Sequence, residues 1–169
     1  AEGREKLKAQ HARGSPGVQV CARLTALLDD IVRDLYEAAL RDLGYDTPDG
    51  LRQQIALVPH GGYGRRALAP YSDVDLMLLH TSSTRPQVAA LAKRLMQDIY
   101  DVGLDLGHSV RTPSEACQLA KGDVTIYTSL TESRLLAGSD VVYRRFITRF
   151  TRLTQRRADS FLHALVNAR

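Results

Sequence analysis

The stretch from Gly61 to Leu79, GGYGRRALAPYSDVDLMLL, constrains this chain most, because a glycine-rich turn runs directly into a strand-like segment with two carboxylates. Residues two apart in a strand point to the same side, so Asp73 and Asp75 are expected to share one face. Adjacent carboxylates repel each other unless a cation lies between them, and Mg²⁺ suits such a pair because it prefers oxygen ligands. The opposite face would be anchored in a core by Val74, Leu76 and Leu78.

The glycines before the strand add a way to bind phosphate, because glycine lets backbone N–H groups approach phosphate oxygens closely. Mg²⁺ held by carboxylates usually binds substrate phosphates as well, so the stretch predicts phosphoryl or nucleotidyl transfer. Residues 62–67 also fit the dinucleotide fingerprint G-x-G-x-x-A, but that motif requires a helix directly afterwards, and the turn at 70–72 leaves no room for one. A Walker-type loop is excluded because no Gly-Lys-Ser/Thr follows. The remaining alternative is a hairpin with two solvated aspartates.

Length and composition favour one soluble globular domain, since 169 residues can form a core and the chain is 44% hydrophobic and 25% charged. No apolar run approaches the length of a membrane crossing, and the first residues are charged rather than signal-like. Cys21 and Cys117 fit no metal or redox spacing, so we expect a reducing, cytoplasmic location. The net charge of +4 is compatible with a nucleotide, a nucleic acid or an acidic protein as partner.

Periodicity predicts a small mixed sheet covered by helices, an α/β or α+β arrangement. A basic, flexible lead-in is expected over 1–17. Pro59 argues for an edge strand or an early exit from the first strand. Thr112 to Glu115 supplies a capping box, and Gly44, Gly103 and Gly122 are expected to end helices. Strands are expected over 55–58, 73–79 and 104–110, and helices over 18–43, 86–102, 113–121, 124–137 and 140–169.

The glycine pair and the Asp-x-Asp strand resemble the signature of the DNA polymerase β-like nucleotidyltransferase superfamily. The longer string is similar to the nucleotidyltransferase domain of bacterial PII uridylyltransferase/uridylyl-removing enzymes. Two later segments support the resemblance, GLDLGHSVRTPSEACQLA at 103–120 and DVTIYTSLTESRLLAG at 123–138. Arg66 and Ala67 stand where this family commonly has Gly and Glu.

The resemblance implies a nucleotidyltransferase domain over 18–138 that transfers UMP from UTP to a tyrosine of the PII signalling protein, followed by a C-terminal helical segment over 139–169. It implies that Asp73 and Asp75 hold Mg²⁺, that Gly61 and Gly62 place backbone donors against the triphosphate, and that Ser72 adds a hydroxyl. Full enzymes of this family continue into HD and ACT domains, which do not fit in 169 residues. We therefore expect an isolated catalytic domain or a truncated relative.

For several residues the sequence leaves two interpretations open, a role in the site or a solvated position on the surface. Asp105 is the best candidate for a third catalytic and metal-binding carboxylate, or else a solvated strand residue. Arg65 and Arg66 either neutralise phosphate charge or are solvated loop residues, and the same holds for Arg111. The arginines of the last helix are expected to form a solvated surface rather than a nucleic-acid face.

Other functions stay open as well. The same fold could use another donor or acceptor, as in adenylylation of a protein or transfer to RNA or a small molecule. It could also be an inactive nucleotide-binding module.

Overall fold

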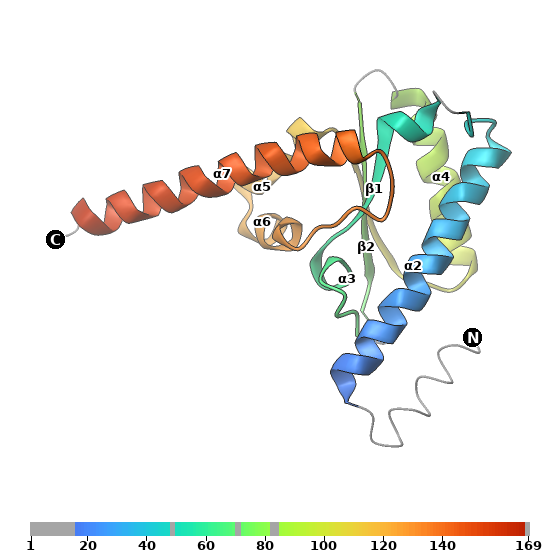
Figure 1. Cartoon of the computed structure of the whole chain (residues 1–169), viewed down its shortest axis with the longest axis horizontal. Coiled ribbons are helices and arrows are strands. Elements are labelled where there is room, and N and C mark those ends of the chain that lie inside the picture. The colour runs from blue at the N-terminus through green and yellow to red at the C-terminus, as the bar shows by residue number, and fades with distance from the viewer. Residues whose placement is uncertain (1–15, 48–49, 70–71, 82–84, 168–169) are drawn as a thin grey trace.

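The computed structural model describes residues 16–47, 50–69, 72–81 and 85–167 (Figure 1). It shows a mixed four-stranded sheet with helices on both faces, which confirms the expected fold class. Of the expected lead-in over 1–17, only its last two residues are described, and the turn at Pro70 and Tyr71 also lies outside the described residues. No helix of the described part is long and apolar enough to cross a membrane.

The sheet has the strand order β3-β2-β1-β4. Strand β2 lies between β1 and β3, pairing antiparallel with β1 and parallel with β3, while β4 pairs antiparallel with the other side of β1. The strands are β1 (Ile55–Pro59), β2 (Val74–His80), β3 (Leu106–Arg111) and β4 (Ala137–Gly138). The helices are α2 (Gly17–Asp42), the 3-10 turn η1 (Leu51–Gln54), α3 (Gly61–Gly64), α4 (Arg85–Asp101), α5 (Pro113–Gly122), α6 (Val124–Thr131) and α7 (Asp140–Asn167).

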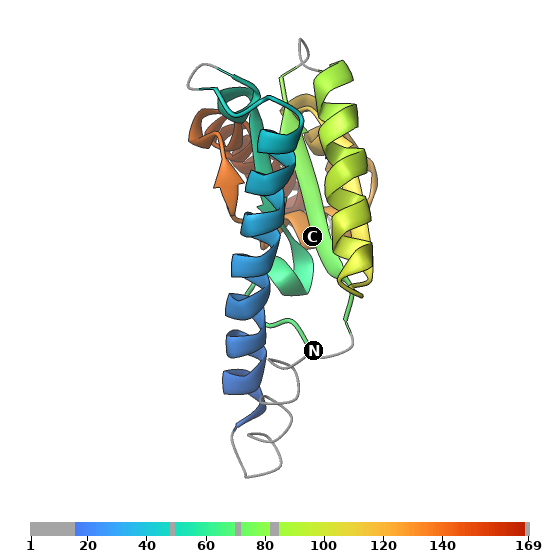
Figure 2. The same cartoon turned by 90° about the vertical axis from the view of Figure 1, so that its right-hand side faces the viewer.

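One face of the sheet, called here the α2–α4 face, is covered by α2 and α4, which lie side by side over it (Figures 1 and 2). Val74, Leu76 and Leu78 of β2 are buried in this core with Leu24, Leu28 and Val32 of α2 and with Leu91, Leu95 and Ile99 of α4. The alternation in β2 and the three- and four-residue spacing in both helices therefore meet in one apolar layer, as the sequence predicts.

The other face, called here the cavity face, carries Asp75 and Met77 of β2 and Gly107, Ser109 and Arg111 of β3. Helices α5, α6 and α7 lie on this face, where Phe146 and Phe150 of α7 share a second core with Val58 of β1 and Met77 of β2. Tyr127 of α6 stacks on Phe150 with 5.4 Å between ring centroids. The second half of α7 extends beyond the sheet (Figure 1).

Most helix boundaries match the sequence patterns. Gly44 and Gly103 follow α2 and α4 with φ of 69° and 76°, the left-handed conformation that ends helices. Thr112 and Glu115 form both hydrogen bonds of the capping box, and Asp123 accepts from the backbone N–H groups of Thr125 and Ile126. These local signals work because each satisfies backbone groups that the helix itself leaves open.

Two expectations about the elements are wrong, the helix bounds after Val124 and the start of the third strand. The helix expected over 124–137 ends at Thr131, because the following segment turns to pair with β1: Leu136 N–H donates to Leu57 O at 2.9 Å, and β4 forms there. Of the two alternatives drawn from Pro59, the early exit is confirmed, because β1 ends at Pro59 and lies between β2 and β4 rather than at an edge. The predicted glycine-rich turn is a single helical turn, α3. Strand β3 begins at Leu106, so Asp105 precedes it.

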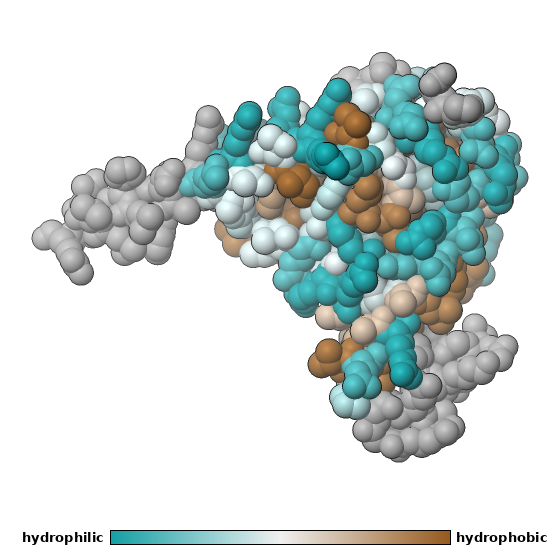
Figure 3. Space-filling model, viewed as in Figure 1, coloured by the Kyte–Doolittle hydropathy of each residue, from teal (hydrophilic) through white to brown (hydrophobic). Residues whose placement is uncertain are grey.

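The visible surface is mainly hydrophilic (Figure 3). Hydrophobic side chains reach it near the first turns of α7 and at the first turn of α2, where Val141 is 57% exposed and Val18 is 82% exposed.

Candidate active site

Two glycines make room for the carboxylate of Asp75. Gly107 lies opposite Asp75 in the parallel pair of β2 and β3, and a Cβ at Gly107 would lie only 2.5 Å from Asp75 Oδ1. A Cβ at Gly61 would lie 3.1 Å from Asp75 Oδ2 and 3.0 Å from Ser129 Oγ. Gly61 also has a φ of 56°, which glycine adopts without strain. The Asp75 carboxylate therefore lies between the neighbouring strand and the start of α3.

The turn α3 is closed by a Schellman motif. Arg66 N–H donates to Tyr63 O at 3.3 Å, and Ala67 N–H donates to Gly62 O at 3.0 Å. This motif places its left-handed residue at Arg66, whose φ of 61° is the single positive value for a non-glycine residue in the described part of the chain. Arg66 stands where the resembling family commonly has glycine, and the backbone angle gives the physical reason.

The first residue of α3, Gly61, lies against the Asp75 carboxylate. His60, just before α3, donates its backbone N–H to Asp75 O at 3.1 Å, which ties the start of the turn to β2. The His60 ring Nδ1 lies 2.8 Å from Ser129 Oγ on α6. The start of α3 (His60 and Gly61), β2 (Asp75) and α6 (Ser129) thus meet around one point.

Burial raises the pKa of the Asp75 carboxyl, the nearby His60 lowers it, and the charge of Asp73 raises it further. Burial lowers the pKa of His60, and the neighbouring Asp75 acts in the opposite direction. A half-buried carboxylate beside a second one is stabilised by a cation, because a cation offsets both the lost hydration and the repulsion.

The structure brings Asp73 to Asp75 but does not gather all three predicted carboxylates. Asp73 and Asp105 are exposed residues just before β2 and β3, and Val74 N–H donates to Asp105 O at 2.9 Å. Their backbones are therefore neighbours at the same end of the sheet. Among the described residues, no group of three or more His, Cys, Asp or Glu side chains is placed to hold a metal ion. The predicted Ser72 is exposed and donates its backbone N–H to Ala69 O at 3.1 Å.

The two predicted phosphate arginines lie at the end of α3 away from Asp75. Arg65 forms an ion pair with Glu132 at the end of α6, and its side chain is 58% exposed. Arg66 is also exposed. Neither contacts the carboxylate pair in the described structure, so their predicted role with phosphate stays a prediction.

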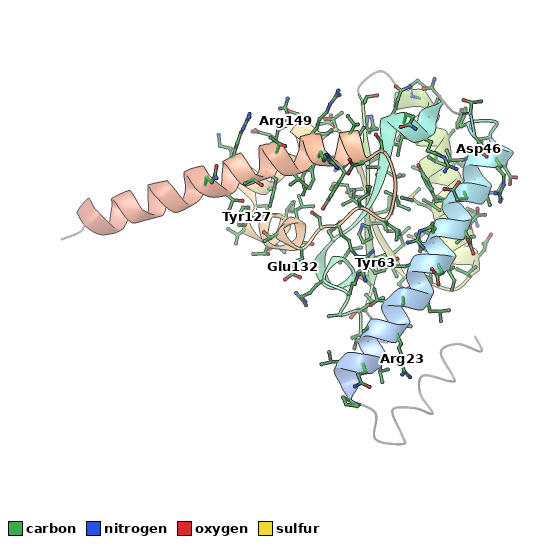
Figure 4. The ribbon with its side chains drawn as sticks, viewed as in Figure 1. Arg23, Asp46, Tyr63, Tyr127, Glu132 and Arg149 are labelled. Atoms are coloured by element: carbon green, nitrogen blue, oxygen red, sulfur yellow. The ribbon has the colours of Figure 1, made fainter. Side chains whose placement is uncertain are left out.

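Sequence reasoning missed the residue that fixes α3. Arg134, in the segment between α6 and β4, donates from Nη2 to Asp29 Oδ1 of α2 at 2.6 Å and from Nε to Gly64 O at 3.1 Å. Its guanidinium carbon also lies 5.2 Å from the centre of the Tyr63 ring, which is turned into the body of the molecule (Figure 4). Arg134 therefore joins α2, α3 and the end of α6. The residues are far apart in sequence, so no local pattern indicates the contact.

A cavity of about 360 Å³ opens beside Asp75 on the cavity face. Its polar lining residues are His60, Asp75, Ser109, Arg111, Thr125 and Ser129, and its apolar ones are Met77, Ala116, Leu119, Ile126 and Leu130. The arrangement combines a cation-seeking carboxylate pair, a glycine turn and an adjacent largely apolar cavity. Such a site can hold a charged group at one end and a flat apolar group at the other.

Comparison with known proteins identifies relatives of this chain. It is 34% identical over 165 residues to the bifunctional uridylyltransferase/uridylyl-removing enzyme of Bradyrhizobium sp. (strain ORS 278), a match over 96% of this chain and 18% of that enzyme. Enzymes of the same name from Pseudomonas entomophila and Burkholderia lata are 38% and 41% identical over 69% and 64% of the chain, and over 12% and 13% of those enzymes. The chain is a homologue of these uridylyltransferases.

The uridylyltransferase resemblance drawn from the central motif is thereby confirmed. The chain spans less than a fifth of the length of these curated relatives. No family model matches the chain. A crystal structure of a toxin–antitoxin with AMP-PNP superposes with a TM-score of 0.42 at 16% identity, covering 80% of this chain and 95% of that one.

Proposed function

We propose that this chain is a Mg²⁺-dependent nucleotidyltransferase that transfers UMP from UTP to a tyrosine hydroxyl of a PII signalling protein. The observation that carries the proposal is the Asp75 carboxylate, set between Gly61 and Gly107 beside Asp73 and at the edge of a cavity. Homology to enzymes named uridylyltransferases supports the choice of UTP.

The residues at this end of the sheet fit Mg²⁺. Asp73 and Asp75 offer oxygen ligands, and their mutual repulsion is relieved when a cation binds. Mg²⁺ is usually held by one or two carboxylates together with substrate phosphates, so a protein site with two carboxylates is sufficient. Asp105, just before the neighbouring strand β3, is proposed as a third ligand. When bound, Mg²⁺ neutralises the triphosphate charge and lowers the pKa of the acceptor hydroxyl.

The glycine turn is proposed to hold the triphosphate. The first N–H groups of a helical turn have no partner within the helix, and Gly61 and Gly62 carry no side chain of their own that would cover them. In the reaction the tyrosine hydroxyl loses its proton to solvent and its oxygen attacks the α-phosphorus of UTP. The bond between the α-phosphorus and the oxygen that bridges it to the β-phosphorus breaks, and pyrophosphate leaves. Ser72 adds a hydroxyl near the carboxylates, and Arg65 reaches the triphosphate only by leaving Glu132.

The test is a transfer assay with α-labelled UTP, ATP and CTP, Mg²⁺ and purified PII protein. We expect label from UTP on PII, and no transfer by Asp73→Asn or Asp75→Asn. Asp30→Asn is the matched control, because Asp30 is an exposed carboxylate on α2 that pairs with Arg33. It should transfer like wild type.

Each other result contradicts a distinct part of the proposal. Labelling only from ATP would contradict the donor, and labelling only of RNA would contradict the acceptor. Binding of UTP without turnover, unchanged in Asp75→Asn, would indicate an inactive nucleotide-binding module.

A further inference from the structure

The cavity on the cavity face runs along β3, away from the carboxylates. Asp75 lies opposite Gly107, and Arg111 follows four residues later on the same side of β3. At about 3.3 Å per residue, Arg111 is about 13 Å further along the strand than Gly107. The walls between the two ends are mainly apolar, with Met77, Ala116 and Ile126 among the lining residues. A flat, largely apolar group fits such walls.

Arg111 has donor capacity that the described residues do not use. Its Nη1 donates to the neighbouring Val110 O at 3.0 Å, while its Nε is buried and has no hydrogen-bond partner among the described residues. A guanidinium group carries five N–H donors and no acceptor. Buried donors are nearly always paired in folded proteins, so an unpaired one at a cavity wall points to a partner supplied by a ligand.

We propose that the cavity holds the base of the nucleotide and that Arg111 selects uracil over cytosine. The inference rests on the proposed function, because it assumes that the phosphates lie at Asp75. A nucleotide with its phosphates there directs its base along β3 toward Arg111. Arg111 donors match a carbonyl oxygen, which uracil presents at C4, whereas cytosine presents an amino donor at that position. Two donor groups facing each other exclude cytosine, and the adenine amino group meets the same obstacle.

The experiment measures the affinities of non-hydrolysable UTP and CTP analogues with Mg²⁺ by titration calorimetry. The proteins are wild type, Arg111→Gln, Arg111→Lys and Arg149→Gln. Arg149 is the matched control because it is an exposed arginine on α7 that does not line this cavity (Figure 4). Wild type should prefer the UTP analogue by about tenfold or more, the discrimination expected of a paired base contact.

Arg111→Gln should reduce the ratio of the two affinities to near unity, mainly by weakening the binding of the UTP analogue. Arg149→Gln should keep the wild-type ratio. Arg111→Lys, which retains the charge but loses the planar donor pair, should fall between and serves if Arg111→Gln does not fold. An equal loss of affinity for both analogues in these variants would place Arg111 at the phosphates. That result would overturn the inference about the base but not the proposed function. An unchanged preference in both variants would do the same. Failure of wild type to bind either analogue with Mg²⁺ would overturn the proposed function as well.

Discussion

The two faces of the sheet use alternate residues of the same strands, yet the described residues border spaces of very different size on the two faces. On the α2–α4 face, Leu76 and Leu78 border a hollow of about 20 Å³, enough for one water molecule at most. On the cavity face, Asp75 and Met77 border a space of about 360 Å³. A shift of one residue along β2 therefore separates a close-packed core from a candidate active site.

The difference comes from what faces each side chain. Leucines of β2 meet leucines of α2 and α4, and their burial stabilises the fold. Asp75 meets glycines, which supply no side chain and leave its carboxylate accessible. Packing on the α2–α4 face fixes the position of β2, and this position in turn sets where the Asp75 carboxylate lies on the cavity face. Changes on the first should thus alter stability, and changes on the second should alter activity.

The largest effect is expected on the α2–α4 face. Leu76 is 4% exposed, and Leu76→Ala should lower the free energy of unfolding by about 3 kcal/mol, because it removes buried methyl groups and leaves a void. Chemical denaturation measures this change. Transfer activity per folded molecule should stay near wild type, and a selective loss of activity would contradict the division of roles.

On the cavity face, Gly107→Ala should act on activity instead. The added Cβ would lie 2.5 Å from Asp75 Oδ1, so the carboxylate must move, and a displacement of this order costs about 100-fold in rate. The melting temperature should change little, because the atom that gives way is the end of a side chain. Gly122→Ala is the control, since a Cβ there meets nothing within 4 Å. Equal rates for both variants would show that the position of Asp75 does not matter.

Arg134→Ala should lower both stability and transfer activity, because Arg134 joins the turn α3, which lies next to Asp75, to helix α2. The change leaves Asp29 without its partner, and both side chains of the pair are mostly buried, at 17% and 11% exposed. We expect the free energy of unfolding to fall by about 2 kcal/mol, which is less than the loss expected when a fully buried ion pair is broken. Arg94→Ala breaks ion pairs with Asp42 and Asp98 in which the Arg94 side chain is 42% exposed, so it should lower the free energy of unfolding much less than Arg134→Ala. Thermal unfolding of both variants tests the contrast.

The smallest expected effect is a gain in stability at Arg66. Arg66→Gly should raise the free energy of unfolding by about 0.5 kcal/mol, because the relief of a left-handed arginine exceeds the added flexibility of the unfolded chain. Arg65→Gly is the matched comparison, since Arg65 has an ordinary φ of −69° and should become less stable as glycine. A loss of stability in both variants would mean that Arg66 is not strained.

Much of the fold is predictable because it depends on local signals. The leucine spacing of α2, the capping box at Thr112 and the alternation in β2 each act within a few residues. Strand β4 could not be predicted, because two residues carry no periodicity and their extended shape comes from pairing with β1. The same pairing ends α6 at Thr131, against a pattern that continues to Ala137.

The site was predictable only in part. The order of glycines and aspartates indicates Asp73 and Asp75, since residues two apart in a strand are expected to share one face, although β2 begins at Val74 and Asp73 precedes it. A lone glycine in a strand often marks a close approach, and this signal could have pointed to Gly107 beside Asp75. The contact of Arg134 with Asp29 spans 105 residues of sequence, so it depends on the completed fold. The cavity likewise exists only once α5 and α6 are packed against the sheet.

The central claim, that Asp75 on the cavity face binds a divalent cation together with a nucleotide, is tested most directly with Mn²⁺, which shares the oxygen-ligand preference of Mg²⁺. Electron paramagnetic resonance measures Mn²⁺ uptake by wild type and Asp75→Asn with a non-hydrolysable UTP analogue. Burial raises the pKa of Asp75, so the ionised form destabilises the fold at neutral pH, and the neutral Asn should melt at or above the wild-type temperature.

We predict nucleotide-dependent Mn²⁺ binding by wild type and binding weaker by at least about tenfold in a fully folded Asp75→Asn, the loss that even changes outside the ligand shell can cause. Equal Mn²⁺ binding by the two folded proteins would contradict the claim.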